Sequence, residues 1–255
     1  MAAMAPIAAE APIVKQYTLL HFDDPPDGVT GVLDEADIEI SDFETALDYI
    51  SGATILTSNK KFGTGCLTLN GSSDYVESFA SYEKYNFRGE DFTVDWWEYR
   101  LDAAAGKSVV SRSPSAGFSP FVFGYSDGTN LRAFITSNGA SWDIANSRNM
   151  GTITTGAWTH YAITREGDTY RTFKNGAQQD TWTSSLDILV TTDNLSIGRY
   201  STNYYNGHID EFRMIKGYAE YTAAFSTKTR QYLINGINWS VFKTVGEITA
   251  DVILT

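Results

Sequence analysis

Three alternating carboxylates, Glu35, Asp37 and Glu39, form the pattern in this sequence that is best suited to chemistry. In a β-strand alternate side chains point to the same face, so this spacing would place all three on one surface. Two carboxylates held in that way can hydrolyse a glycosidic bond, one as nucleophile and the other as general acid. The surroundings favour another interpretation, because residues 16–59 contain ten acidic residues and no Lys or Arg. Such a stretch is typical of a solvated acidic loop or edge strand, or of a patch that attracts cations.

Histidine and cysteine give no stronger candidate. The three histidines, His21, His160 and His208, lie far apart, and no Gly-x-Ser-x-Gly motif is present to carry a serine nucleophile. Neither a Cys-x-x-Cys nor a His-x-x-x-His spacing occurs, so a zinc site is not predicted. The single cysteine, Cys66, excludes a disulfide within the chain and lies in a predicted strand, where a buried inert thiol is expected. We expect structural roles for all four side chains.

The composition indicates one large domain. With 255 residues, of which 42% are hydrophobic and 14% aromatic, the chain can fill the core of a single β-sandwich. A formal net charge of −12 opposes binding to nucleic acid and to anionic membranes, because these carry the same sign of charge. No run of about 18 apolar residues occurs, so a membrane-spanning helix is not predicted. The N-terminal residues have no basic group before their short apolar stretch, so we expect no secretory signal.

Turn motifs divide the chain into short segments rich in Val, Ile, Thr and aromatic residues. Asn175-Gly176 is the clearest turn, because both residues tolerate the positive φ that a type I′ hairpin requires. The spacing of the turns is typical of antiparallel sandwiches. We predict strands at residues 17–22, 66–70, 92–99, 107–112, 120–126, 130–136, 141–146, 158–165, 169–174, 178–184, 194–198 and 206–215. Short helices are predicted at residues 43–50 and 219–225.

A series of short motifs can be compared with known families. They include Phe92-Thr-Val-Asp-Trp96-Trp97, Trp158-Thr-His160-Tyr-Ala162, Phe173-Lys-Asn175-Gly176, Leu195-Ser-Ile197-Gly198 and Ile209-Asp210-Glu211-Phe212-Arg213. Together with residues 17–23 and 61–71, they resemble laminin-G-like domains of the concanavalin A-like lectin and glucanase superfamily. The resemblance covers residues 17–232 and implies an all-β fold, an antiparallel β-sandwich of the concanavalin A-like jelly-roll type. Residues 1–16 are predicted to form an extended N-terminal arm, and residues 233–255 a C-terminal β-like extension.

The resemblance also bears on catalysis. Glycosidases of this superfamily carry a Glu-x-Asp-x-Glu triplet on a central strand, and residues 93–99 take that position here. This segment has Asp95 but not three alternating carboxylates, whereas the triplet at residues 35–39 falls in the variable insertion after the first strand. We therefore predict that the protein is not an enzyme and has no catalytic residues.

A structural calcium ion is implied by the same resemblance. Many relatives bind one, and residue-by-residue comparison points to Asp23 and Asp210, with a backbone carbonyl near residue 63 or 65. Ca²⁺ accepts six to eight oxygen ligands in loose geometry, which suits ligands from separated strands. Alternatively, Asp210 and Glu211 pair with Arg213 or cap a turn.

Aromatic residues are the candidates for sugar binding. Alternation along the predicted strand 92–99 places Phe92, Val94 and Trp96 on one face and Asp95, Trp97 and Tyr99 on the other. If the first set fills the core, the second lines the concave face of the sandwich, where an indole stacks against a sugar ring and a carboxylate accepts hydrogen bonds from the sugar hydroxyls. Further aromatic residues expected near the rim are Trp142, Tyr200, Tyr204 and Tyr205. Alternatively, a large sandwich simply needs aromatic residues on both sheets.

We therefore predict a non-enzymatic virion structural protein, a capsid decoration or tail-associated component that displays a lectin-like jelly roll able to bind surface glycans. Laminin-G-like domains resembling this one recur in tailed-phage structural proteins. The expected partners are other virion proteins, contacted through the terminal arms, and a host-surface glycan. We expect a homo-oligomer that binds neither nucleic acid nor membrane. The alternatives are a secreted or cell-surface carbohydrate-binding adhesin, which would be extracellular, and a glycoside hydrolase.

Overall fold

The computed structural model describes residues 16–23, 47–78, 83–112 and 117–232. The acidic triplet at residues 35–39 lies outside the described residues, as do the C-terminal extension and all but the last residue of the N-terminal arm. Within the described part no helix is long or apolar enough to span a membrane. Apart from a single 3-10 turn, η1 (Glu83–Tyr85), the regular elements are β-strands, so the all-β prediction is confirmed.

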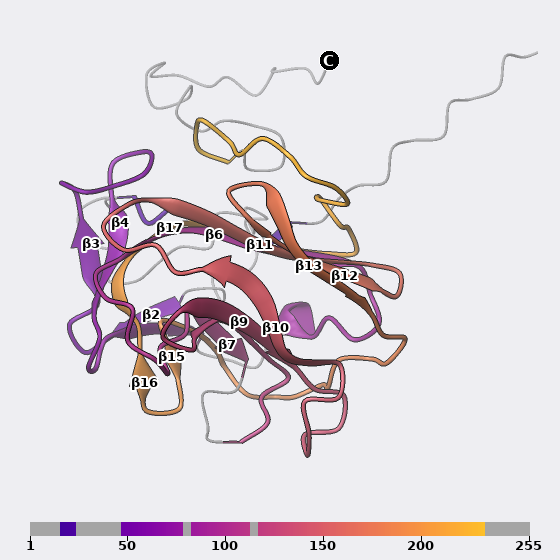
Figure 1. Ribbon diagram of the computed structural model, residues 1–255. Coiled ribbons are helices and arrows are strands. Elements are labelled where there is room, and N and C mark those ends of the chain that lie inside the picture. Colours follow the sequence, from indigo (N-terminus) through magenta and orange to yellow (C-terminus); the bar gives the residue numbers. More distant parts are fainter. Residues whose placement is uncertain (1–15, 24–46, 79–82, 113–116, 233–255) are drawn as a thin grey trace, which may run out of the picture.

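Two antiparallel sheets lie face to face (Figure 1). Sheet A contains, in order, β13 (Ala177–Thr183), β12 (Thr169–Lys174), β11 (Thr159–Glu166), β6 (Phe92–Arg100), β17 (Asn206–Lys216), β4 (Cys66–Asn70) and β3 (Thr54–Leu56), and β1 (Gln16–Leu20) also pairs with β17. Sheet B contains, in order, β10 (Ala145–Thr152), β9 (Asn130–Ile135), β8 (Phe121–Ser126), β7 (Val110–Arg112), β14 (Leu195–Ile197), β5 (Tyr75–Ser78) and β2 (Leu47–Ile50). A small hairpin of β15 (Arg199–Tyr200) and β16 (Asn203–Tyr204) follows β14. The predicted antiparallel sandwich is therefore present.

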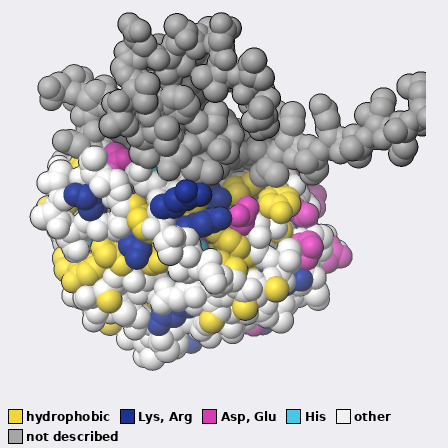
Figure 2. Space-filling model, turned by 90° about the horizontal axis from the view of Figure 1, so that it is seen from above, with side chains coloured by type: hydrophobic (Ala, Val, Ile, Leu, Met, Phe, Trp, Pro, Cys, Tyr) yellow, Lys and Arg dark blue, Asp and Glu magenta, His cyan; other side chains and the backbone are white. Residues whose placement is uncertain are grey.

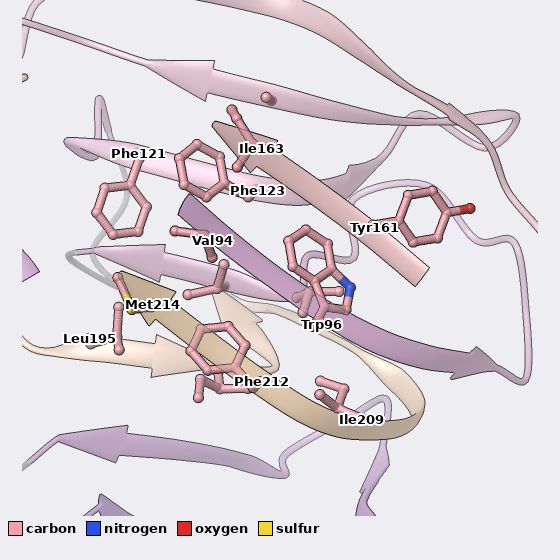
Figure 3. Packing of buried hydrophobic residues seen from close by; sticks show 14 of the residues in the cluster. Val94, Trp96, Phe121, Phe123, Tyr161, Ile163, Leu195, Ile209, Phe212 and Met214 are labelled. Atoms are coloured by element: carbon pink, nitrogen blue, oxygen red, sulfur yellow. The ribbon is translucent and has the colours of Figure 1, made fainter. Parts of the chain in front are cut away.

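The core lies between the sheets and is built by alternation along the strands. Phe92, Val94 and Trp96 of β6 all enter it, as predicted. Phe121 and Phe123 of β8 meet them from sheet B, and Figure 3 shows these side chains interleaved with others from β11, β14 and β17. Burial of this much aliphatic and aromatic surface is the main stabilising contribution to the fold.

Some element predictions are wrong. Residues 47–50 form β2 rather than a helix, because pairing with β5 outweighs local helix propensity. Residues 219–225 form no helix, since the carbonyls of Tyr218 and Tyr221 accept hydrogen bonds from sheet A instead. The strand predicted at residues 141–146 begins only at Ala145. The strands β2, β3 and β5 and the hairpin of β15 and β16 were not predicted.

Residues 218–232, here called the crossing segment, lie on the outer face of sheet A. Thr93 of β6 and Thr164 of β11 donate hydroxyl hydrogen bonds to its carbonyls, at 3.2 and 2.8 Å. The rings of Tyr221 and Phe225 stack at 3.7 Å and pack, with Phe173, in a second small apolar cluster. In Figure 1 this yellow part of the chain runs above the upper sheet. The outer face of sheet A is therefore partly covered, whereas the outer face of sheet B lies on the opposite side of the sandwich.

Candidate functional site

Asp95, predicted to bind a glycan, is fully buried on the outer face of sheet A. Its two oxygens accept hydrogen bonds from Arg213 at 2.9 and 2.8 Å, and Oδ2 also accepts from the hydroxyls of Tyr221 and Tyr232. Burial alone would raise the pKa of Asp95, but the charge of Arg213 and a hydrogen bond from His160 hold the pKa well below its ordinary value. The carboxylate is thus used within the fold and does not reach a surface.

Trp97 and Tyr99, the other two predicted glycan-binding residues, differ in their exposure. Trp97 is only 4% exposed: the ammonium of Lys61 lies 4.0 Å from its ring, and Phe62 packs edge-on at 5.8 Å. Tyr99 is partly exposed and contacts the ring of Trp158 at 5.8 Å. Asp95, Trp97 and Tyr99 therefore do not form the expected ligand-binding surface, because the crossing segment and the turn at residues 61–62 cover this side of sheet A.

The predicted calcium ligands hold a turn together. Asp210 Oδ2 accepts the backbone N–H groups of Lys61 and Phe62, at 2.8 and 3.0 Å. Asp23 Oδ1 accepts those of Thr64 and Gly65. Both carboxylates therefore cap the same turn from opposite ends, which is the arrangement that the alternative interpretation of Asp210 describes.

One oxygen of this pair has no donor. Asp210 Oδ1 is buried without a hydrogen-bond partner, whereas both oxygens of Asp23 accept hydrogen bonds, Oδ2 from Gln231 at 2.7 Å. Among the described residues, no group of three or more His, Cys, Asp or Glu side chains could hold a metal. A single free carboxylate oxygen does not supply the six to eight oxygen ligands that Ca²⁺ takes. Calcium binding stays a prediction.

The histidines and the cysteine have structural environments. His21 Nδ1 lies 2.6 Å from Glu211 Oε1, with both side chains buried, and His208 Nδ1 lies 2.9 Å from the hydroxyl of Thr68. Cys66 is buried, and burial raises the pKa of its thiol to about 12. A thiol with so high a pKa is not a nucleophile at neutral pH, as the sequence predicted.

Sheet B presents a different outer face. Five aromatic side chains there form one continuous group, here called the aromatic patch: Phe118, Tyr125, Phe134, Trp142 and Tyr200. Successive ring centroids are 5.1 Å apart from Phe118 to Trp142, 5.2 Å from Trp142 to Phe134, 5.4 Å from Phe134 to Tyr125 and 6.4 Å from Tyr125 to Tyr200. Phe118 is 39% exposed, and the other four are partly exposed. Of these, Trp142 and Tyr200 were predicted near the rim of the surface formed by Asp95, Trp97 and Tyr99, which lies on sheet A instead.

Alternation places Phe134 on the outer face. In β9, Leu131, Ala133 and Ile135 enter the core, so Arg132 and Phe134 point outward. The outward position of Phe134 can therefore be predicted from the sequence, because apolar and other residues alternate in residues 130–135.

A β-bulge at Gly124 turns Tyr125 outward. Phe121 and Phe123 point into the core, so strict alternation would send Tyr125 there too. The pairing with β9 shifts by one residue between Val122 and Tyr125, which brings Tyr125 opposite Arg132 on the outer face. Gly124 has φ of +69°, and a Cβ there would lie 2.9–3.0 Å from Val109 and Trp96, so only glycine fits.

The loop that carries Trp142 is fixed by its own hydrogen bonds. Asn138 Oδ1 accepts the N–H groups of Ala140 and Ser141, at 2.7 and 3.0 Å. Asp143 accepts from both the N–H and the hydroxyl of Ser137. Burial opposes ionisation of Asp143, but these hydrogen bonds lower the pKa of its carboxyl overall. The indole is therefore held in place before any ligand arrives, which reduces the entropic cost of binding.

Two arginines beside the patch are both paired. Arg132, opposite Tyr125, donates from Nε to Asp127 at 2.6 Å. Arg199, next to Tyr200, lies 2.9 Å from Glu77. Figure 2 shows the opposite, sheet A side, where basic and acidic side chains gather beside the grey residues. The aromatic patch is thus an apolar surface with polar groups at its edge, the usual composition of a sugar-binding surface.

Two packed antiparallel sheets with this strand order define a lectin-like jelly roll. The chain belongs to the concanavalin A-like lectin/glucanases superfamily, whose family model matches residues 70–219. All five residues of the aromatic patch lie within the match. A search of curated proteins found no match.

Solved structures with this fold include several binding domains. The chain is similar to domain 4 of AbnA, a GH43 extracellular arabinanase from Geobacillus stearothermophilus, in complex with arabinotriose, with 16% identity and a TM-score of 0.55 over 80% of this chain and 93% of that one. It is also similar to the binding domain of Paraclostridial Mosquitocidal Protein 1, with 16% identity and a TM-score of 0.57 over 81% of this chain and 50% of that one. The receptor-binding domain of botulinum neurotoxin type G gives 11% identity and a TM-score of 0.56 over 80% and 49%. The chain spans about half the length of the two toxin domains, and at these identities the likeness shows the fold alone.

Proposed function

We propose that the protein is a non-catalytic glycan-binding module and that the aromatic patch is its binding surface. The observation that carries the proposal is the contiguity of five partly exposed aromatic side chains on the outer face of sheet B. Aromatic faces stack on the apolar faces of sugar rings, and the fixed loop around Trp142 favours such contacts. The arabinotriose complex of the arabinanase domain supports the same class of ligand.

The carboxylates near the patch and on β6 support a binding rather than a hydrolytic role. Hydrolysis of a glycosidic bond requires two free carboxyl groups facing the sugar. In the described part of the chain, Asp127 and Asp143 at the patch are engaged by backbone or side-chain donors, and Asp95 is paired with Arg213. We expect no release of reducing ends from laminarin, lichenan, agarose or carrageenan.

Binding by the patch can be tested with matched single substitutions. Phe118 and Tyr218 are 39% and 41% exposed, but Tyr218 belongs to the crossing segment on the other side of the sandwich. On a panel of polysaccharides, Phe118→Ala and Trp142→Ala should weaken binding about tenfold or more, since each removes an apolar contact worth about 1.5–3 kcal/mol. Tyr218→Ala should bind as the wild type does. Equal losses in all three variants, or no binding by the wild type, would contradict the proposal.

We further propose that this module is displayed on a virion as a capsid decoration or tail-associated protein that does not contact nucleic acid. The alternative is a secreted adhesin. The support is the resemblance to tailed-phage structural proteins and the net charge of −12. The arms that would anchor the module lie outside the described residues. Deleting residues 1–16 or residues 233–255 should leave a soluble, folded domain that no longer enters particles, measured by co-sedimentation with the assembled virion. If both truncated proteins still entered virions normally, the proposal would be contradicted.

A further inference from the structure

We infer that the ligand of the aromatic patch is a short stretch of an uncharged glycan, and that Arg132 donates hydrogen bonds to the hydroxyl groups of that glycan. The inference rests on the proposed function and adds the ligand class and a specificity-determining side chain.

The patch is compact rather than elongated. Its first member precedes β8 and its last member belongs to β15, yet the hydroxyl of Tyr200 donates a hydrogen bond to the carbonyl of Gly117, the residue next to Phe118. The five rings therefore close on one another around the outer side of β8 instead of forming a long line across the sheet. Consecutive rings meet at interplanar angles of 52–86°, so the surface offers single ring faces to a sugar rather than a continuous flat track. Such a surface can contact a few sugar units at most.

The charges around the patch disfavour an acidic sugar. An acidic glycan needs an unpaired guanidinium or ammonium group to replace the water around its carboxylate or sulfate. Of the described cations next to the patch, Arg132 is paired with Asp127 and Arg199 with Glu77. The net charge of −12 adds long-range repulsion of polyanions.

Arg132 is well placed to donate hydrogen bonds. It lies opposite Tyr125 in the β8–β9 pairing and two residues from Phe134, on the same outer face. Its Nε is used by Asp127, whose other oxygen accepts the N–H groups of Thr129 and Asn130 at 2.9 and 2.7 Å. Asp127 thereby fixes the plane of the guanidinium and leaves donors at its other end, beside the rings on which the sugar would stack.

The test uses isothermal titration of the full chain with neutral oligosaccharides of one to six units and with their uronic acid or sulfated counterparts. The affinity for the neutral series should rise over the first few units and then stay constant, and the acidic series should bind at least about tenfold more weakly. Arg132→Gln should lower the neutral-sugar affinity about tenfold, the usual effect of losing a hydrogen bond from a charged donor. Asp127→Asn keeps the acceptor for the turn but frees the positive charge, so it should selectively strengthen binding of the acidic series.

The outcomes separate this inference from the proposed function. Affinity that keeps rising through six units, tighter binding of acidic sugars by the wild type, or unchanged binding by Arg132→Gln would overturn the inference while leaving a Trp142-dependent sugar site in place. If no sugar binds at all, the proposed function itself fails. Unfolding curves of the two variants that overlay the wild-type curve would exclude a folding defect as the cause of any loss.

Discussion

Asp95 illustrates how a residue suited to ligand binding can be used by the fold instead. Its position on the outward side of β6 follows from strand alternation, but alternation says nothing about what lies above that face. The crossing segment brings Tyr221 and Tyr232 over it, and Arg213 completes an ion pair with both oxygens. These are contacts between residues more than a hundred positions apart, which no local pattern encodes.

Removing the charge of Asp95 should therefore destabilise the protein. Asp95→Asn leaves the buried guanidinium of Arg213 without its partner, which costs about 3–5 kcal/mol. The free energy of unfolding, measured with urea, should fall by that amount. The matched control is Glu83→Gln, which breaks the exposed pair with Arg88 and should change the free energy by less than about 1 kcal/mol. Equal effects of the two substitutions would show that the buried Asp95–Arg213 pair contributes no more to the free energy of unfolding than an exposed ion pair does.

Asp210 gives a prediction with a definite sign. Burial and the neighbouring Glu211 raise the pKa of Asp210 well above its ordinary value. A carboxyl whose pKa is higher in the folded than in the unfolded state binds protons preferentially in the folded state, so its contribution to stability grows as the pH falls through the folded-state pKa towards the unfolded-state pKa. In the presence of a chelator, Asp210→Asn should flatten this part of the profile of unfolding free energy against pH. The prediction would be contradicted if the unfolding free energy of the wild type did not rise on acidification, or if the rise persisted in Asp210→Asn.

The calcium prediction can be judged in the same experiment. A folded-state ligand stabilises by mass action, so binding through Asp210 would make the Tm rise with added Ca²⁺ and fall with chelator, and Asp210→Asn would abolish the difference. If the Tm does not change with calcium or chelator, Asp210 acts only as a cap of the turn.

At the scale of elements, the bulge in β8 controls the aromatic patch. Gly124→Ala forces a Cβ against Val109 and Trp96 at a positive φ, so we expect a loss of about 2 kcal/mol or more in unfolding free energy, together with weaker sugar binding because Tyr125 is displaced. Gly167→Ala is the control, since it shares a positive φ but meets nothing within 4 Å. Its cost should be smaller, and its sugar binding normal. Normal sugar binding by Gly124→Ala would show that the bulge does not position the patch.

Strand alternation predicts some of the outward-facing side chains but not all of them. Alternation in residues 92–97 and 130–135 correctly separates core side chains from outward ones, so Phe134 could have been found. Tyr125 was not found, because one extra residue at Gly124 reverses the alternation; the isolated glycine within the strand is the local sign of that bulge. Tyr205, expected at the rim, is fully buried beneath the guanidinium of Arg100. Tyr204, its neighbour, is partly exposed and packs near Tyr75.

At the scale of the whole molecule, the two outer faces of the sandwich carry different side chains. The outer face of sheet A carries buried ion pairs under the crossing segment, and the outer face of sheet B carries the aromatic patch. The family relationship and the similar solved structures define the fold on which such a surface is placed, but they do not say which face binds. We propose that sheet B is that face.

The indole N–H signals of the six tryptophans test this claim directly. In a ¹⁵N-resolved NMR titration with a neutral oligosaccharide, with signals assigned by single Trp→Phe substitutions, the Trp142 signal should shift with a saturable dependence on sugar concentration. The signals of Trp97 and Trp158, on the outer face of sheet A, should stay in place. Shifts of Trp97 or Trp158 with an unmoved Trp142 would place the sugar on sheet A and contradict the account.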